Sequence, residues 1–248
     1  MKVTVRRGFL GLLLALVARK VLIALVVMKE NFVFMLNRHV LNMTSNWLCS
    51  THVHSSSLFV TMDEESRQFL EEVWPSVHVL PLDIISLQAP FNYGDGPYQL
   101  FYLLRATLSL SFVQEGATFW MSQQDTYWRG YYRARPTKGA RRFFQKLALD
   151  LSWWYSPDNA YMSAMCRRGS ARCGYLPFET IPNWKWLYDR PSVSSFTQLP
   201  PLLQFDGETK LGGKLATFLV DLLYSFPPSA LLLDYFILPC AHFFMLSM

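Results

Sequence analysis

The stretch SLFVTMDEE, residues 57–65, contains one structural element and the start of the next. Residues 57–61 form a short run of mainly apolar side chains, which is typical of a buried strand. Thr61 and Glu64 have the spacing of a capping box, in which two side chains satisfy backbone groups at a helix start. The residues after Glu64 predict a helix that ends before Pro75. This helix places four apolar side chains on one face: Phe69, Leu70, Val73 and Trp74.

The same alternation of strand and helix continues on both sides of this unit. Apolar runs predict further strands at 32–36, 77–82 and 117–121, and helical patterns cover 44–51 and 97–116. Such alternation predicts an α/β fold with a Rossmann-like, mainly parallel sheet flanked by helices. Ligands of these sheets bind at the carboxyl ends of the strands. We expect 117–121 to be the central strand, with the segment after it reaching a cleft.

Composition and charge exclude some classes of protein. The chain has 248 residues, of which 51% are hydrophobic and 16% aromatic, so it is not a disordered protein. Its formal net charge is +5. Outside the N-terminus the basic residues are scattered, apart from the pairs Arg141–Arg142 and Arg167–Arg168. A nucleic-acid-binding protein needs a denser basic face, so we expect no nucleic acid among the partners.

Residues 1–30 are predicted to be a signal anchor or signal segment. Apolar runs at 8–18 and 21–28 are together long enough to cross a bilayer, with Arg19 and Lys20 between them. Three interpretations stay open: a signal anchor, a short cleaved signal at 8–18, or a buried first strand at 21–28. As an anchor, the segment attaches the protein to a membrane and sends the rest of the chain into the lumen.

Two further features bear on the cellular compartment. Asn42 begins the triplet Asn-Met-Thr, a sequon for N-linked glycosylation. Cys166 and Cys173 could form a disulfide across a short loop in an oxidising lumen, or could remain buried free thiols. The four cysteines lack the paired spacing of a structural zinc site.

Several stretches, taken together, resemble the nucleotide-diphospho-sugar transferase family, whose members have a glycosyltransferase A-type fold. The resemblance implies a transferase-like domain at 31–215. It also implies transfer of a sugar from a nucleotide-diphosphate sugar to a glycan or glycoprotein acceptor. With the N-terminal segment as an anchor, we expect this domain in the lumen of the Golgi or endoplasmic reticulum, at its membrane. The stretches that carry the resemblance are residues 41–49, 58–65, 93–94, 119–128, 130–137, 158–160 and 176–178.

In this family the loop after a central strand carries Asp-x-Asp. Here the loop reads SQQDTYW at residues 122–128, so Gln123 and Asp125 stand at the two ligand positions. The resemblance implies that Mn²⁺ or Mg²⁺ bridges the diphosphate oxygens and stabilises the departing charge. Asp206 is a candidate substitute ligand. Without the family, the same loop reads as a polar turn with one exposed carboxylate.

Proteins of this fold often close the diphosphate site with His-x-x-Gly-x-x-Lys. Residues 204–210 have that spacing, with Gln in place of His. Gly207 would allow close backbone approach to the diphosphate, and Lys210 or Lys214 would offset its charge. Arg105 could reach a phosphate from the helix that precedes the metal loop. The plainer interpretation of these residues is a surface turn and a solvated arginine.

Asp158 and Asn159 stand where the family has an acidic residue and an amide near the donor sugar, and they are the candidate catalytic residues. The alternative for Asp158 is a purely local role. It follows Pro157 and precedes a helical stretch, as the N-cap of a helix does.

Two departures from the family favour a second hypothesis. Only Arg129 separates Trp128 from Gly130, where the family has a longer segment on the acceptor side. Residues 216–248 form an apolar tail beyond the resemblance. The missing segment and the lost carboxylate at Gln123 fit a catalytically impaired lumenal pseudo-glycosyltransferase, acting as a binding or interaction module. A small multi-span membrane protein fits only the two apolar ends.

Overall fold

The computed structural model describes residues 31–51, 54–92, 94–122, 126–127, 132–175 and 203–204. The chain divides into two compact units. Unit 1 comprises Met1–His39, His54–Ser122 and Gly130–Gly174, and unit 2 comprises Val40–Val53, Gln123–Arg129 and Tyr175–Met248. The predicted N-terminal segment at 1–30 and the apolar tail at 216–248 lie outside the described residues.

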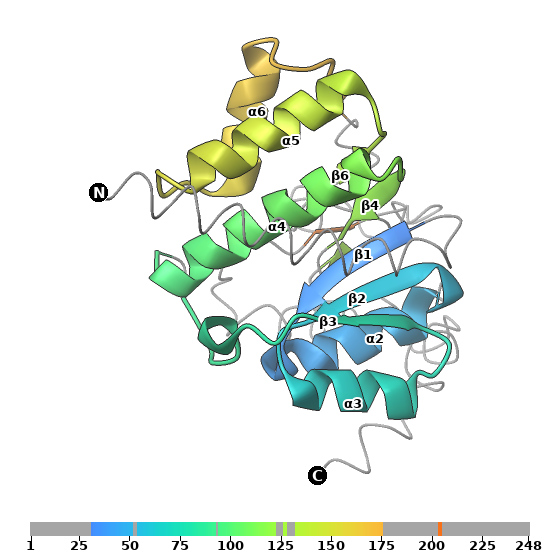
Figure 1. The fold of residues 1–248 in the computed structure, drawn as a ribbon. Helices are drawn as coiled ribbons and strands as arrows, with labels where there is room; N and C mark the ends of the chain where they lie inside the picture. The colour runs from blue at the N-terminus through green and yellow to red at the C-terminus, as the bar shows by residue number, and fades with distance from the viewer. Residues whose placement is uncertain are drawn as a thin grey trace, which may run out of the picture. The chain divides into compact units, whose positions relative to one another are not determined.

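Unit 1 is built on a five-stranded sheet (Figure 1). Its strands are β1 (Asn31–Leu36), β2 (Ser57–Thr61), β3 (His78–Pro81), β4 (Phe119–Met121) and β6 (Tyr132–Ala134). They lie in the order β3-β2-β1-β4-β6. β1 is parallel to both β2 and β4, β2 is parallel to β3, and β6 is antiparallel to β4. The predicted α/β fold with a mainly parallel sheet is therefore confirmed.

The middle strand is β1 rather than β4, so the prediction that 117–121 is central is wrong by one place. β4 lies inside the sheet, between β1 and the antiparallel β6. The apolar runs of the sequence are buried as expected. All five residues of β2 are buried, and the rings of Phe34 and Phe59 stack at 4.9 Å on neighbouring strands. Burial on both faces is the usual state of a parallel sheet, because helices cover each side.

Four helices of unit 1 provide this cover. They are α3 (Glu64–Val73), α4 (Gly96–Gln114), α5 (Lys138–Leu151) and α6 (Asp158–Arg167). α3 packs on β2 and β3, and Figure 1 shows α4 on the other face of the sheet. α5 packs on α4, and α6 packs on both. Because α4 lies between the sheet and this helix pair, every residue of 102–113 is buried.

The helix start at residue 64 differs in detail from the prediction. Thr61 is still in β2, paired with Leu36 and Pro81, so it cannot cap the helix. The N-cap is Asp63, whose carboxylate accepts hydrogen bonds from the Ser66 backbone N–H at 2.8 Å and the Ser66 hydroxyl at 2.6 Å. The capping-box prediction for Thr61 is therefore wrong, while the predicted helix is present.

The two cysteines left open by the sequence form a disulfide, Cys166–Cys173. It ties the loop after α6 back to the last turn of that helix, and Gly169 in this loop has the positive φ of 72° that favours glycine. The structure therefore supports the first of the two sequence interpretations.

The described part of unit 2 is small. It contains α2 (Leu41–Thr51) and an antiparallel pair of two-residue strands, β5 (Thr126–Tyr127) and β7 (Leu203–Gln204). Short 3-10 helices are η1 (Arg38–Val40), η2 (His54–Ser56) and η3 (Ile85–Leu87), the last two in unit 1. Among the helices in the described ranges, none is both long and apolar enough to span a bilayer.

Substituting Phe59 tests whether the stacked rings hold the sheet together. Phe59→Ala should lower the free energy of unfolding by about 3–5 kcal/mol, because it leaves a cavity against Phe34. Ile85→Ala is the control, since Ile85 is 83% exposed and its loss should cost under about 0.5 kcal/mol. Urea unfolding followed by far-UV circular dichroism measures both values. Equal effects of the two substitutions would contradict the described sheet.

Candidate functional site

The carboxyl edge of the sheet is where parallel strands of this kind present ligand-binding groups. β1 is followed at this edge by Asn37, whose amide nitrogen donates to the Leu87 carbonyl at 2.9 Å. Asp63, which follows β2, accepts from the Arg38 backbone N–H at 2.8 Å through its second carboxylate oxygen. Both side chains are buried and hold the loops after β1 and β2 in one arrangement. This edge is therefore a fixed platform.

Ser122 follows β4 at the same edge and is buried, and its backbone N–H donates to the Val33 carbonyl at 2.8 Å. The chain then enters the predicted metal loop. Gln123 and Asp125 lie outside the described residues, as do Asp206, Gly207, Lys210 and Lys214. Their predicted roles stay predictions.

The implied metal ion can be tested only against the part of the chain that is described. Within it, no group of three His, Cys, Asp or Glu side chains could hold a metal ion. The carboxylate of Asp63 is fully engaged by Ser66 and by the Arg38 backbone.

Two predicted site residues, Arg105 and Asp158, bind each other. The Nε and Nη2 atoms of Arg105 donate to the two carboxylate oxygens of Asp158, each at 2.5 Å. Their side chains are only 3% and 1% exposed. This bidentate geometry is the strongest form of ion pair, because both charged groups keep hydrogen-bond partners when they are buried away from water. The pair joins the middle of α4 to the first residue of α6.

Aromatic rings surround the pair. The Arg105 guanidinium lies 5.4 Å from the ring centre of Phe101 and 5.5 Å from that of Tyr102. Close by, the Tyr132 hydroxyl shares a 2.6 Å hydrogen bond with Ser109. Burial, with the nearby Asp158 charge, raises the pKa of Tyr132 well above its usual range, so this phenol stays protonated. The ion pair is thus enclosed in a buried layer between helices.

This geometry changes how the two residues are interpreted. The N-cap of α6 is Pro157, and Asp158 is already the first helical residue, so the prediction that Asp158 caps the helix is wrong. Its carboxylate turns to Arg105 instead, although one oxygen also accepts from the Asn159 backbone at 2.8 Å. The interpretation of Arg105 as a solvated arginine is wrong as well. Asn159 is exposed next to the pair.

The turn between α5 and α6, residues 152–157, is a feature that the sequence did not indicate. The side-chain amide of Gln99 donates to the carbonyls of Leu151 and Trp154 at 2.6 and 2.8 Å, and its oxygen accepts from the Ser156 backbone. The Tyr155 hydroxyl accepts from the Gly94 backbone N–H at 2.6 Å. The side-chain amide of Gln99 thus makes three hydrogen bonds to the backbone at this turn, and these bonds hold the turn in place.

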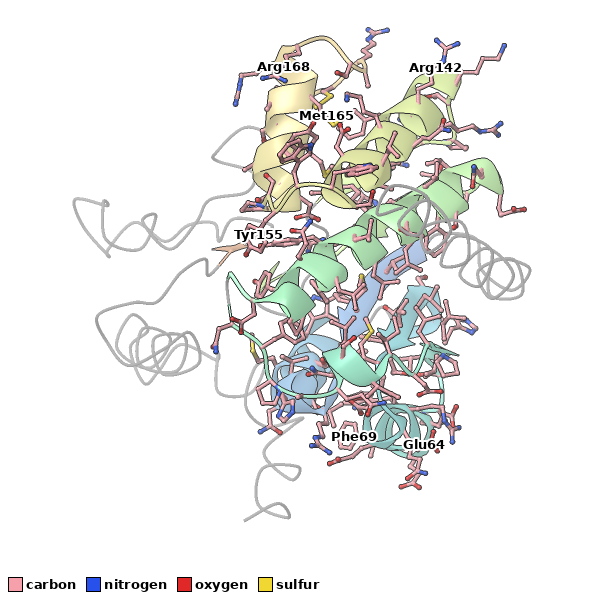
Figure 2. The ribbon with its side chains drawn as sticks, turned by 60° about the vertical axis from the view of Figure 1, so that its left-hand side comes forward. Glu64, Phe69, Arg142, Tyr155, Met165 and Arg168 are labelled. Atoms are coloured by element: carbon pink, nitrogen blue, oxygen red, sulfur yellow. A yellow bond between two sulfur atoms is a disulfide. The ribbon has the colours of Figure 1, made fainter. Side chains whose placement is uncertain are left out.

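The turn lies at the carboxyl edge of the sheet. α4 connects two parallel strands, so its first turn, with Gln99, starts at that edge. On the turn, the Trp154 indole is 72% exposed although the backbone beneath it is held in place. An exposed indole and the exposed amide of Asn159 thus lie on the side of unit 1 where a ligand is expected. Figure 2 shows Tyr155 at this turn, beside the start of α4.

The parallel sheet, its carboxyl-edge platform and the helices on its two faces define an α/β protein, and this architecture is consistent with the glycosyltransferase A-type fold. Residues 52–130 match the family model described as nucleotide-diphospho-sugar transferase. This match covers about a third of the chain and supports the family predicted from the sequence, over the stretch that includes β2, β3, β4 and the residues of the metal loop. No curated protein and no solved structure matches the chain.

A double-mutant cycle tests whether the Arg105–Asp158 pair is mainly a structural link. Asp158→Ala should lower the free energy of unfolding by about 3–5 kcal/mol, because it leaves the buried guanidinium of Arg105 without its counter-charge. Arg105→Met alone and the double substitution Arg105→Met with Asp158→Ala complete the cycle. The double variant should be less destabilised than Asp158→Ala, since no uncompensated charge remains. Thermal and urea unfolding give the values. Additive losses in the cycle would show that the two side chains do not interact.

Proposed function

We propose that this protein is a glycosyltransferase that transfers a sugar from a nucleotide-diphosphate sugar to a glycan or glycoprotein acceptor. The observation that carries the proposal is the family match at residues 52–130, which covers three parallel strands and the loop after β4. The donor would bind at the carboxyl edge of the sheet, where β1 and β2 end in the fixed loops of Asn37 and Asp63.

The assistance of a metal ion is part of this proposal and rests on the family. Mn²⁺ or Mg²⁺ would bind the diphosphate with Asp125, Gln123 and, in addition, Asp206 as protein ligands. The bound ion would supply Lewis-acid stabilisation of the leaving nucleoside diphosphate. Gly207, Lys210 and Lys214 would line the diphosphate.

The described residues suggest a division of roles around the sugar. Arg105 and Asp158 neutralise each other in the interior and position α6, so their part in the reaction is indirect. Asn159, next to Asp158, is exposed and suited to contact sugar hydroxyls. Trp154, on the turn between α5 and α6, is exposed and suited to contact the apolar face of a sugar ring. Among the predicted catalytic residues, Asn159 is therefore the better candidate for direct contact.

A second candidate function is donor binding without transfer. Gln123 replaces a carboxylate at one ligand position, and Arg129 alone separates Trp128 from Gly130. A transferase must hold the acceptor oxygen within attacking distance of the sugar, and the short connection removes a family segment on that side. Such a protein would act as a lumenal binding or interaction module.

The proposed location is the lumenal side of the Golgi or endoplasmic reticulum membrane. The Cys166–Cys173 disulfide supports it, since disulfides persist in oxidising compartments. The apolar runs at 8–18 and 21–28 would form the anchor.

Calorimetry with UDP and GDP, with and without Mn²⁺, tests donor and metal binding. Mn²⁺ should tighten binding of one nucleotide at least tenfold. Asp125→Ala should abolish the gain, and Gln123→Asp should enlarge it because it supplies a second carboxylate. Lys138→Ala, on the far edge of the sheet, is the control. If neither nucleotide binds with any metal, the proposed function is wrong.

The same preparation separates the two candidates. Release of free nucleotide from UDP- and GDP-sugars, with Mn²⁺ present, measures donor turnover. Turnover above that of the Asp125→Ala variant supports the transferase. Nucleotide binding without turnover, even after a relative's segment is inserted after Arg129, supports the binding module.

Expression in eukaryotic cells tests the location. The side chain of Asn42 is exposed on α2, so the sequon should carry a glycan that a glycosidase removes with a visible mass shift. Asn42→Gln should lack the shift. A full chain that is found in the cytosol, with no glycan in the wild type, would contradict lumenal residence.

A further inference from the structure

Residues 132–175 carry an excess of positive charge. This segment has nine lysines and arginines but only two carboxylates. One carboxylate, Asp158, is neutralised in the interior by Arg105. The other, Asp150, binds Lys146 at 2.6 Å and accepts from the Tyr161 hydroxyl at 2.7 Å. The remaining cations therefore have no acidic neighbour within this segment to balance them.

Strand register shows where these cations lie. Asn31, the first residue of β1, pairs with Phe119, and Phe119 pairs with Ala134 at the end of β6. Residues 31, 119 and 134 therefore mark one edge, the amino edge of the parallel strands. α5 starts four residues after Ala134, at Lys138, so its first turn is at this amino edge. Arg141 also donates to the Val113 carbonyl, in the last turn of α4.

The end of α6 returns to the start of α5. Tyr161, in the first half of α6, bonds Asp150 near the end of α5, so the two helices run in opposite directions. Figure 2 shows Arg142 of α5 and Arg168 after α6 toward the same end of this pair. The disulfide holds Arg172 near the end of α6. We name the exposed cations of this end the amino-edge cluster: Lys138, Arg141, Arg142, Arg167, Arg168 and Arg172.

The chain that precedes β1 reaches the same edge. The proposed anchor ends at Met28, and the chain from there to Asn31 can span at most about 11 Å in any conformation. Screening at physiological salt acts over about 8–10 Å, so charges at the amino edge would feel a bilayer that holds the anchor. β6 is two strands from β1, a lateral distance of about 10 Å.

We propose that the amino-edge cluster binds the anionic head groups of the membrane that holds the N-terminal segment. The contact fixes the orientation of unit 1, with its amino edge on the bilayer and its carboxyl edge, the proposed donor site, facing away from it. The proposal rests on the proposed anchor, but it does not depend on whether the protein transfers sugar.

A role of the cluster in binding an acidic acceptor fits the geometry less well. α5 has 14 residues and is about 21 Å long, and it separates the cluster from the turn at 152–157 on the carboxyl edge. An acceptor must place its reacting oxygen about 3 Å from the donor sugar. A ligand bound only at the amino edge is too far from that position, whereas a membrane surface is extended and fits the edge.

Hydrogen exchange of the full chain in lipid nanodiscs tests the contact. One preparation has only phosphatidylcholine, and the other has phosphatidylcholine with phosphatidylserine. Amides at 138–142 and 166–173 should exchange at least fivefold more slowly with the anionic lipid, and α3 should be unchanged. Raising the salt to 0.5 M should remove the difference, because the attraction is screened.

Charge-removing variants distinguish binding by the amino-edge cluster from a general effect of the protein's positive charge. Arg142→Gln with Arg168→Gln should abolish most of the protection, since each cation near an anionic surface strengthens association about fivefold. Arg38→Gln, which removes a half-exposed arginine at the carboxyl edge, is the matched control and should keep the protection from exchange. Carbonate extraction of membranes tests the anchor separately. Equal exchange in both lipids, or protection by soluble polygalacturonate and not by anionic lipid, would overturn the proposal.

Discussion

The parallel pairing of β1 with a strand on each side is the constraint on which the rest of unit 1 depends. Parallel strands all end at the same edge, so each connection must cross back over a face of the sheet. The connection from β2 to β3 crosses through α3 on one face, and the connection from β3 to β4 crosses through α4 on the other. The two edges can therefore carry different chemistry: fixed polar loops after β1 and β2 at one, and exposed cations at the other.

The buried Arg105–Asp158 pair is the second determinant, because it connects the outer helix pair to the layer that covers the sheet. Removing two charges from water is costly, and a buried pair often adds little net stability. What it provides here is one defined arrangement, since any displacement of α6 would separate two charges in an apolar layer. The same link places Asn159 toward the ligand-binding edge while α6 ends among the cations.

The sequence predicted the elements well where the pattern is local. β2 was predicted with its observed bounds, and α4 within two residues, because uninterrupted apolar runs mark buried elements. The link between Arg105 and Asp158 could not be predicted, because 53 residues separate them and both residue types are usually exposed. Likewise, the basic pairs at 141–142 and 167–168 stand out in the sequence, but they are far apart along the chain, and only the antiparallel helices bring them to one end. The predicted metal and phosphate ligands lie outside the described residues, so that part of the candidate site stays a prediction.

The acidic and basic side chains of unit 1 are concentrated in different segments of the chain. Such a separation orients the unit on a charged surface more than it strengthens its binding there. Residues 54–122 carry eight carboxylates against two arginines, the reverse of residues 132–175. On α3, hydrogen bonds from Arg67 and Gln68 lower the pKa of Glu64 to about 2, so this carboxylate stays charged far below neutral pH. Figure 2 shows Glu64 at the opposite end of the unit from Arg142 and Arg168. An anionic surface therefore attracts the end with Arg142 and Arg168 and repels the start of α3, where Glu64 lies.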